Sequence, residues 1–134
     1  MSWARSRFAS LPNSIRRLIK ALGYSYAGFR HAVLKDAAIR DGLLALAILV
    51  PVSILLPVSD MEHLVLVLSM MLVVLVEFVN SAIEAAIDRI SLERHPLAGQ
   101  AKDLGSAAVL IAVLMSGLCW VVIAGPVAMQ WFRQ

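Results

Sequence analysis

The chain has 134 residues and is poor in cysteine, charge and aromatic side chains. A single cysteine, Cys119, excludes an intrachain disulfide, so the sequence says nothing about the redox compartment. Only 16% of residues are charged and 7% aromatic, whereas 60% are hydrophobic and the mean hydropathy is +0.83. These values lie outside the range of ordinary soluble domains. They predict an integral membrane protein, and the length excludes much more than one domain.

Motifs of soluble phosphate-transferring and hydrolytic enzymes are also absent. The chain has no Walker A pattern, no glycine-rich loop of protein kinases and no G-x-S-x-G nucleophile elbow. The three histidines, His31, His63 and His95, are scattered. Its basic residues flank apolar runs without aromatic interleaving, which argues against binding of nucleic acid.

Three apolar runs are long enough to cross a bilayer, which takes about 20 residues. Before them, apolar residues recur at spacings of three and four, the pattern of an amphipathic helix that lies along a membrane surface. The sequence therefore predicts an all-α membrane protein with one surface helix and three transmembrane helices. The predicted segments of this single domain (1–134) are a mobile N-terminus (1–11), the surface helix (12–36) and transmembrane helices at 42–59, 61–91 and 103–132, of which the second ends in a cytoplasmic extension beyond the membrane.

Charge placement predicts the topology. Eight lysines and arginines precede the first span and three lie between the second and third, while the link around Asp60 and Glu62 has none. The positive-inside rule then places the N-terminus and the second connection in the cytoplasm, in a multi-pass protein of the inner (cytoplasmic) membrane. Pro96 and Gly99 predict a helix break and a short loop before the third span. The small residues 105–108 predict close helix contact.

Polar side chains recur where the second span ends. At about 100° per residue they share one helical stripe roughly 100° wide. The stripe consists of Glu77, Asn80, Ser81, Glu84 and Asp88. An acid joined to an apolar span is costly to place in hydrocarbon, so it indicates a functional site. Oxygen-bearing groups on one face suit a hydroxyl, a metal ion or both.

The spacing of two acids in the stripe favours phosphoryl transfer. Glu77 and Glu84 are about 10 Å apart along a helix, too far to act as a pair on one atom. Their spacing suits one carboxylate at a lipid hydroxyl and another holding a cation and phosphate in water. Such a site needs an oriented nucleophile, hard oxygen ligands for Mg²⁺ and cations on the phosphates. Lys102 and the N-terminal arginines are candidates for these cations.

A structural interpretation of the same stripe stays open. In it, Glu77 and Asn80 only hydrogen-bond a neighbouring helix, while Glu84 and Asp88 are solvated and pair with Arg89 or Arg94. Spacing alone does not decide between the two.

Three stretches resemble the bacterial integral-membrane diacylglycerol kinase family, which is unrelated to soluble kinases. They are IKALGYSYAGFR (19–30), VEFVNSAIEAAIDRI (76–90) and HPLAGQAKDLGSAAVLIA (95–112). The resemblance implies a homotrimer whose composite active sites lie at the cytoplasmic interface. It also implies transfer of phosphate from ATP to 1,2-diacylglycerol, giving phosphatidic acid and ADP.

The resemblance also implies roles for individual residues. Glu77 resembles the catalytic base, with Asn80 beside it, and Glu84 and Asp36 resemble the ligands of Mg²⁺. The implied ATP-binding residues are Arg17, Tyr24, Asp36, Glu84, Glu93, Arg94, His95, Lys102 and Asp103. The implied lipid-binding residues are Arg30, Glu77, Ser106 and Trp120. Better-known members carry glutamate at the position of Asp36, so the shorter side chain either draws the backbone closer or binds the ion through water.

Three other functions are alternatives to this one. An undecaprenol kinase of the same family would use the same apparatus on a polyprenol. A small proton-coupled transporter with Glu77 as relay predicts repeats and polar groups near the midplane, whereas the acids here lie at one end. A purely structural membrane subunit leaves the stripe without a purpose.

Overall fold

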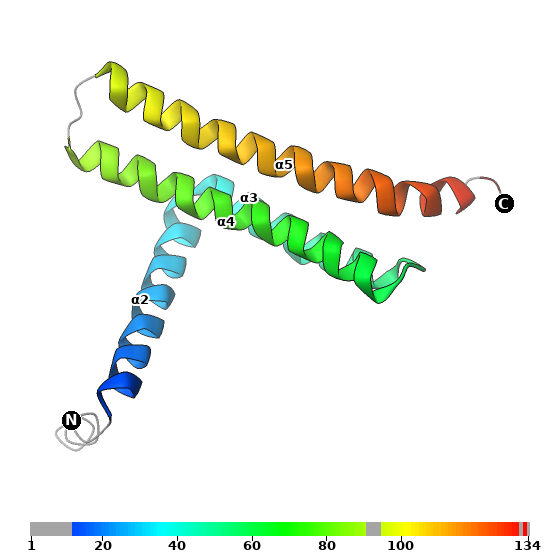
Figure 1. Cartoon of the computed structure of the whole chain (residues 1–134), viewed down its shortest axis with the longest axis horizontal. Coiled ribbons are helices and arrows are strands. Elements are labelled where there is room, and N and C mark those ends of the chain that lie inside the picture. The colour runs from blue at the N-terminus through cyan, green and yellow to red at the C-terminus, as the bar shows by residue number, and fades with distance from the viewer. Residues whose placement is uncertain (1–11, 91–94, 132, 134) are drawn as a thin grey trace. The chain divides into compact units, whose positions relative to one another are not determined.

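The computed structural model describes residues 12–90, 95–131 and 133 (Figure 1). Every regular element in these ranges is an α-helix: α2 (Asn13–Lys35), α3 (Ala37–Leu55), α4 (Asp60–Ile90) and α5 (Pro96–Trp131). Three of them, α3, α4 and α5, are long and apolar enough to cross a membrane. The predicted all-helical fold with three apolar spans is therefore confirmed. The N-terminus predicted to be mobile (1–11) lies outside the described residues.

The chain divides into two units, Met1–Lys35 and Asp36–Gln134. In the first, α2 is a single helix of 23 residues with none buried. It carries the apolar spacing expected of a surface helix, and its position at a membrane surface stays a prediction.

In the second unit, α3 begins earlier than predicted, at Ala37 instead of residue 42. Asp36 causes the early start, because its carboxylate accepts the backbone N–H groups of Ala38 (2.9 Å) and Ile39 (3.3 Å). Aspartate is among the best residues for such an N-cap. Pro51 lies inside α3, which continues to Leu55.

A capping box starts α4. Glu62 accepts the backbone N–H of Ser59 (2.7 Å) and its hydroxyl (2.6 Å), and the Glu62 N–H returns a bond to Ser59 Oγ (3.4 Å). This reciprocal arrangement satisfies N–H groups that the first turn leaves without partners. The turn between α3 and α4 is thus fixed by local sequence.

The predicted loop before the third span is wrong from Pro96 onward, where α5 already begins. Proline is favoured at the first helical position because its missing N–H would have no partner there. His95 caps this start: its Nδ1 accepts the N–H of Leu97 (3.2 Å) and its carbonyl accepts that of Gly99 (3.1 Å). Lys102 therefore lies on a helix, two turns from its start, rather than on a loop.

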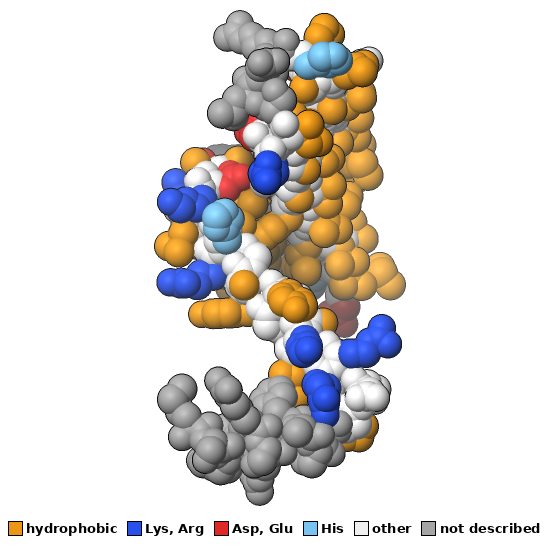
Figure 2. Space-filling model, turned by 90° about the vertical axis from the view of Figure 1, so that its left-hand side faces the viewer, with side chains coloured by type: hydrophobic (Ala, Val, Ile, Leu, Met, Phe, Trp, Pro, Cys, Tyr) orange, Lys and Arg blue, Asp and Glu red, His pale blue; other side chains and the backbone are white. Residues whose placement is uncertain are grey.

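Within the second unit α4 packs against both α3 and α5 (Figure 1). Its buried residues Leu66, Met70 and Val74 recur every four positions and so lie on one face. Most other large apolar side chains are exposed, and hydrophobic surface dominates the bundle in Figure 2. This distribution suits helices surrounded by hydrocarbon.

Several contacts join α4 and α5 along their length. At Gly105, a Cβ would lie 2.1 Å from Asn80 Oδ1, so the close approach predicted for the small residues is confirmed there. Residues 106–108 are exposed, so they take no part in that contact. Further along, the hydroxyls of Ser69 and Ser116 lie 3.2 Å apart.

Candidate active site at the end of α4

The polar stripe of α4 faces two neighbouring helices. Ser81 donates its hydroxyl to the carboxylate of Asp36, the residue that caps α3. Asn80 packs against Gly105 of α5, and Asp88 reaches Lys102 of the same helix. The stripe therefore lies at the junction of all three spans.

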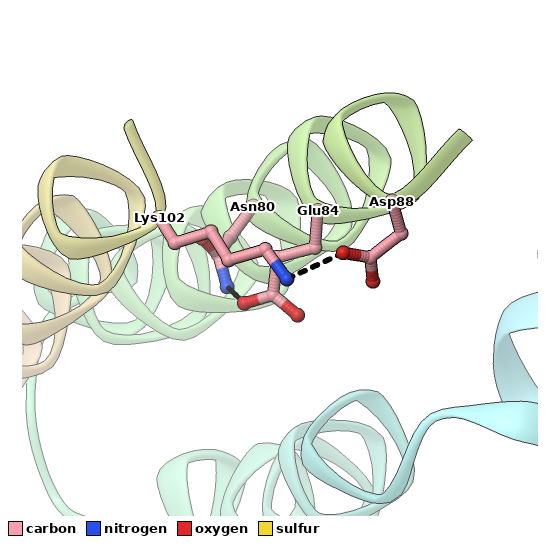
Figure 3. Close-up of polar contacts among 4 residues, drawn as sticks. All are labelled: Asn80, Glu84, Asp88 and Lys102. Carbon is pink, nitrogen blue, oxygen red and sulfur yellow. Dashed lines mark hydrogen bonds and ion pairs between the residues drawn. The ribbon is translucent and has the colours of Figure 1, made fainter. Parts of the chain in front are cut away.

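Asn80 orients the carboxylate of Glu84. Its side-chain Nδ2 donates to Glu84 Oε1 over 3.0 Å, one helical turn further on (Figure 3). The Oδ1 of Asn80 is buried and has no hydrogen-bond partner among the described residues. The amide is thus held by packing on one side and by the glutamate on the other.

Lys102 joins α5 to the stripe. Its Nζ lies 2.6 Å from Asp88 Oδ1 and within electrostatic reach of Glu84 (Figure 3). The structural interpretation paired Asp88 with Arg89 or Arg94, whereas the structure shows an ion pair of Asp88 with Lys102 across the helix interface. Arg94 lies outside the described residues.

Asp36 enters the stripe from the start of α3. The hydroxyl of Ser81, then the backbone N–H groups of Ile39 and Ala38, hold the pKa of its carboxyl below the ordinary value. Asp36 is therefore ionised at neutral pH. Ser81 and Glu84 are three residues apart on one helix face, so Asp36 is brought close to the same face as Glu84.

Glu77 is half-buried, one turn before Ser81. The carboxylates of Asp36 and Glu84 lie within electrostatic reach of it. Several acids gathered in this way favour a cation or a proton between them. Among the described residues, however, no three His, Cys, Asp or Glu side chains form a complete metal site by themselves.

Other residues predicted for the site lie elsewhere or are not placed. Asp103 and Ser106 are exposed on α5, and the Nδ1 of His95 is used as the helix cap. Trp120 is half-buried about 27 Å along α5 from Lys102. The remaining residues are Arg17, Tyr24 and Arg30, which are exposed on α2 in the first unit, and Glu93 and Arg94, which lie outside the described residues.

Sequence reasoning named no partner for Ser81 and did not find the pairing of Asp88 with Lys102. A signal for Asp88 existed, since it lies four residues after Glu84 on the same face and so shares any cation that approaches. No such signal existed for Ser81, whose partner is 45 residues away.

The fold and the site define a three-span helical membrane protein with clustered carboxylates and a lysine at one end of its second span. The chain belongs to the prokaryotic diacylglycerol kinase family, whose sequence profile matches residues 23–124.

Named relatives cover most of the chain. It is 46% identical to diacylglycerol kinase of Escherichia coli (strain K12) over 107 residues, 80% of this chain and 88% of that protein. Identity to diacylglycerol kinase of Pseudomonas aeruginosa is 45% over 109 residues, 81% and 89% of the two chains. For diacylglycerol kinase of Helicobacter pylori (strain 26695) it is 38% over 105 residues, 78% and 82%.

Proposed function

We propose that this chain is an ATP-dependent diacylglycerol kinase, which transfers the γ-phosphate of ATP to the hydroxyl of 1,2-diacylglycerol to give phosphatidic acid and ADP. The observation that carries the proposal is the family match over residues 23–124. This range includes the polar cluster, which consists of the stripe on α4 and its partners Asp36 and Lys102. The named relatives support diacylglycerol as the lipid. The undecaprenol alternative is an outcome of the test below.

Glu77 is the proposed base. It lies at the half-buried start of the stripe, nearest to the apolar part of α4, where a lipid hydroxyl at interface depth would arrive. Its carboxylate accepts the hydroxyl proton while the lipid oxygen bonds to the γ-phosphorus and the bond from that phosphorus to ADP breaks. Asn80, one turn on, holds the neighbouring Glu84 in place.

The nucleotide side is assigned to Glu84, Asp36 and Lys102. Mg²⁺ is usually bound by one or two carboxylates together with substrate phosphates rather than by a complete protein cage. Two carboxylates near one helix face fit that pattern, since the part of the chain that the structure describes holds no group of three such ligands. When bound, Mg²⁺ neutralises charge on the phosphates in such reactions. The ammonium of Lys102 adds positive charge beside Glu84.

The proposal also covers the oligomeric state, the membrane topology and the remaining site residues. We infer a homotrimer in the inner membrane with composite sites, and with the N-terminus and the connection before Pro96 in the cytoplasm. The surface helix α2 would supply Arg17 and Tyr24 to the nucleotide and Arg30 to the lipid. Glu93, Arg94, His95 and Asp103 are assigned to ATP, and Ser106 and Trp120 to the lipid.

The purified chain in detergent micelles, given Mg-ATP and either diacylglycerol or undecaprenol, tests the lipid. We expect labelled phosphate from γ-labelled ATP on diacylglycerol. If only undecaprenol is labelled, the lipid substrate is undecaprenol instead of diacylglycerol. If neither lipid is labelled, the kinase assignment is overturned.

The variant Glu77→Gln tests the base in the same assay. We expect kcat to fall at least about 100-fold, the usual share of general-base catalysis, with the oligomer intact by gel filtration. Glu62→Gln is the matched control, because it makes the same change at the other end of α4 and glutamine still serves in a capping box. Substantial activity of Glu77→Gln would remove Glu77 as the base.

A further inference from the structure

Asp88 has no part in the reaction as proposed above, although it forms an ion pair with Lys102. The ammonium of Lys102 crosses from α5 and stops 2.6 Å from Asp88 Oδ1, with Glu84 as its other acidic neighbour (Figure 3). The ammonium of Lys102 therefore lies near two carboxylates, those of Glu84 and Asp88, which are one helical turn apart on α4. It pairs with the one further from the membrane-spanning part of α4.

Stability does not account for this pair. The side chains of Lys102 and Asp88 are 38% and 54% exposed, and exposed pairs contribute little to folding because water and salt screen them. The close approach of α4 and α5 is already fixed by another contact, that of Gly105 with Asn80. The pair therefore fixes the position of an ammonium rather than of a helix.

We propose that Asp88 is a positioning residue that holds the Lys102 ammonium off the carboxylate of Glu84 and so keeps that carboxylate open to the metal ion of the nucleotide. This inference rests on the proposed function.

The physical reason for this proposal is that the Lys102 ammonium and a metal ion would compete for the carboxylate of Glu84. Asn80 already occupies Glu84 Oε1. If Asp88 were neutral, the nearest remaining carboxylate for Lys102 would be Glu84, and an ammonium bonded there would compete with a divalent ion for the same oxygens. Groups that orient a metal ligand in this way typically change metal affinity about 10- to 100-fold when removed.

Asp88→Asn tests the proposal, with Asp60→Asn as matched control at the opposite end of α4. We expect the Mg²⁺ concentration for half-maximal activity to rise about 10-fold, with kcat within about twofold of wild type and with rescue by Asp88→Glu. Mn²⁺ binding, followed by electron paramagnetic resonance with a non-hydrolysable ATP analogue, should weaken by the same factor without any turnover.

A double variant separates positioning from general damage. In a Lys102→Met background no ammonium can move onto Glu84, so adding Asp88→Asn should leave Mn²⁺ affinity unchanged. An equal loss in that background, or a fall in kcat at unaltered metal dependence, would overturn the proposal. Should Asp88→Asn not assemble, Asp88→Ser serves instead. Wild-type turnover of diacylglycerol, measured in parallel, shows separately whether the proposed function holds.

Discussion

Asp36 performs two tasks with one short side chain. Its Oδ1 caps α3 through the N–H of Ala38, and its Oδ2 accepts the hydroxyl of Ser81 from α4. Aspartate is a strong N-cap, whereas glutamate is not among the preferred residues. The aspartate at this position is therefore well suited to start α3 at Ala37. A metal ion that binds Asp36 directly would have to share an oxygen with one of these donors.

This arrangement predicts a pH-dependent stability. Since the folded-state pKa of Asp36 lies below its ordinary value of about 4, its ionised form stabilises the fold above that value, and the contribution is lost as the pH falls through the lowered pKa. Ser81→Ala should lower the unfolding temperature by a few degrees at neutral pH, and the difference from wild type should vanish in acid. Circular dichroism of the protein in micelles measures it.

Ser25→Ala, on the exposed surface of α2, is the matched control for Ser81→Ala and should leave the unfolding temperature unchanged. A difference between Ser81→Ala and wild type that is equally large in acid would show that the hydroxyl stabilises the fold by packing instead of through the charge of Asp36.

At the scale of elements, the crossing of α4 and α5 depends on a missing side chain. An alanine Cβ at position 105 would lie 2.1 Å from Asn80 Oδ1 and 3.2 Å from its Cγ, so the amide would have to move. The bond from Asn80 to Glu84 would be lost with it. A change on α5 thus reaches a proposed metal ligand on α4 without touching it.

We predict that Gly105→Ala lowers activity at least about 10-fold, because Asn80 can no longer orient Glu84, while stability falls much less, since alanine favours the helix by about 1 kcal/mol. Measuring the activity and the unfolding temperature of the same preparation tests both parts of this prediction. Gly117→Ala on the same helix, where no atom lies within 4 Å of the added Cβ, is the control and should keep both. Unchanged activity of Gly105→Ala would show that Asn80 does not act through this contact.

Local sequence determined much of this arrangement. Apolar run lengths gave the three spans, and the 100° periodicity gathered Glu77, Glu84 and their neighbours on one face. What it could not give was the partner across an interface, since the contact between Ser81 and Asp36 depends on how two helices pack. The prediction of a loop at Pro96 was wrong, because the sequence does not distinguish a proline that breaks a helix from one that begins a helix. The difference depends on capping by His95, which only the structure shows.

At the scale of the whole molecule, a single chain leaves its spans largely uncovered. Between 11% and 17% of the residues in the most apolar window of each span are buried. Lipid or further subunits must cover the rest, which agrees with the proposed trimer. The polar cluster is different, because Asn80, Glu84, Asp88 and Lys102 already meet within one chain.

That observation predicts the outcome of mixing subunits. Glu84→Gln and Lys102→Met should each be inactive, and assemblies formed from both should stay inactive, since no chain holds both side chains. Activity of purified co-expressed assemblies measures this. Glu84→Gln mixed with wild type controls for assembly and should keep activity in proportion to the wild-type share. Restored activity in the first mixture would show that neighbouring subunits contribute the two residues to one site.

The hydroxyl contact between Ser69 and Ser116 and the glycine contact between Asn80 and Gly105 share one register. From Ser69 to Asn80 is eleven residues, and from Gly105 to Ser116 is eleven as well, about 16 Å of helix in each case. Deleting one residue from either stretch would rotate and shift one contact while the other stayed behind. Descendants of this chain could therefore adapt to a thinner or thicker bilayer only by shortening or lengthening both stretches together.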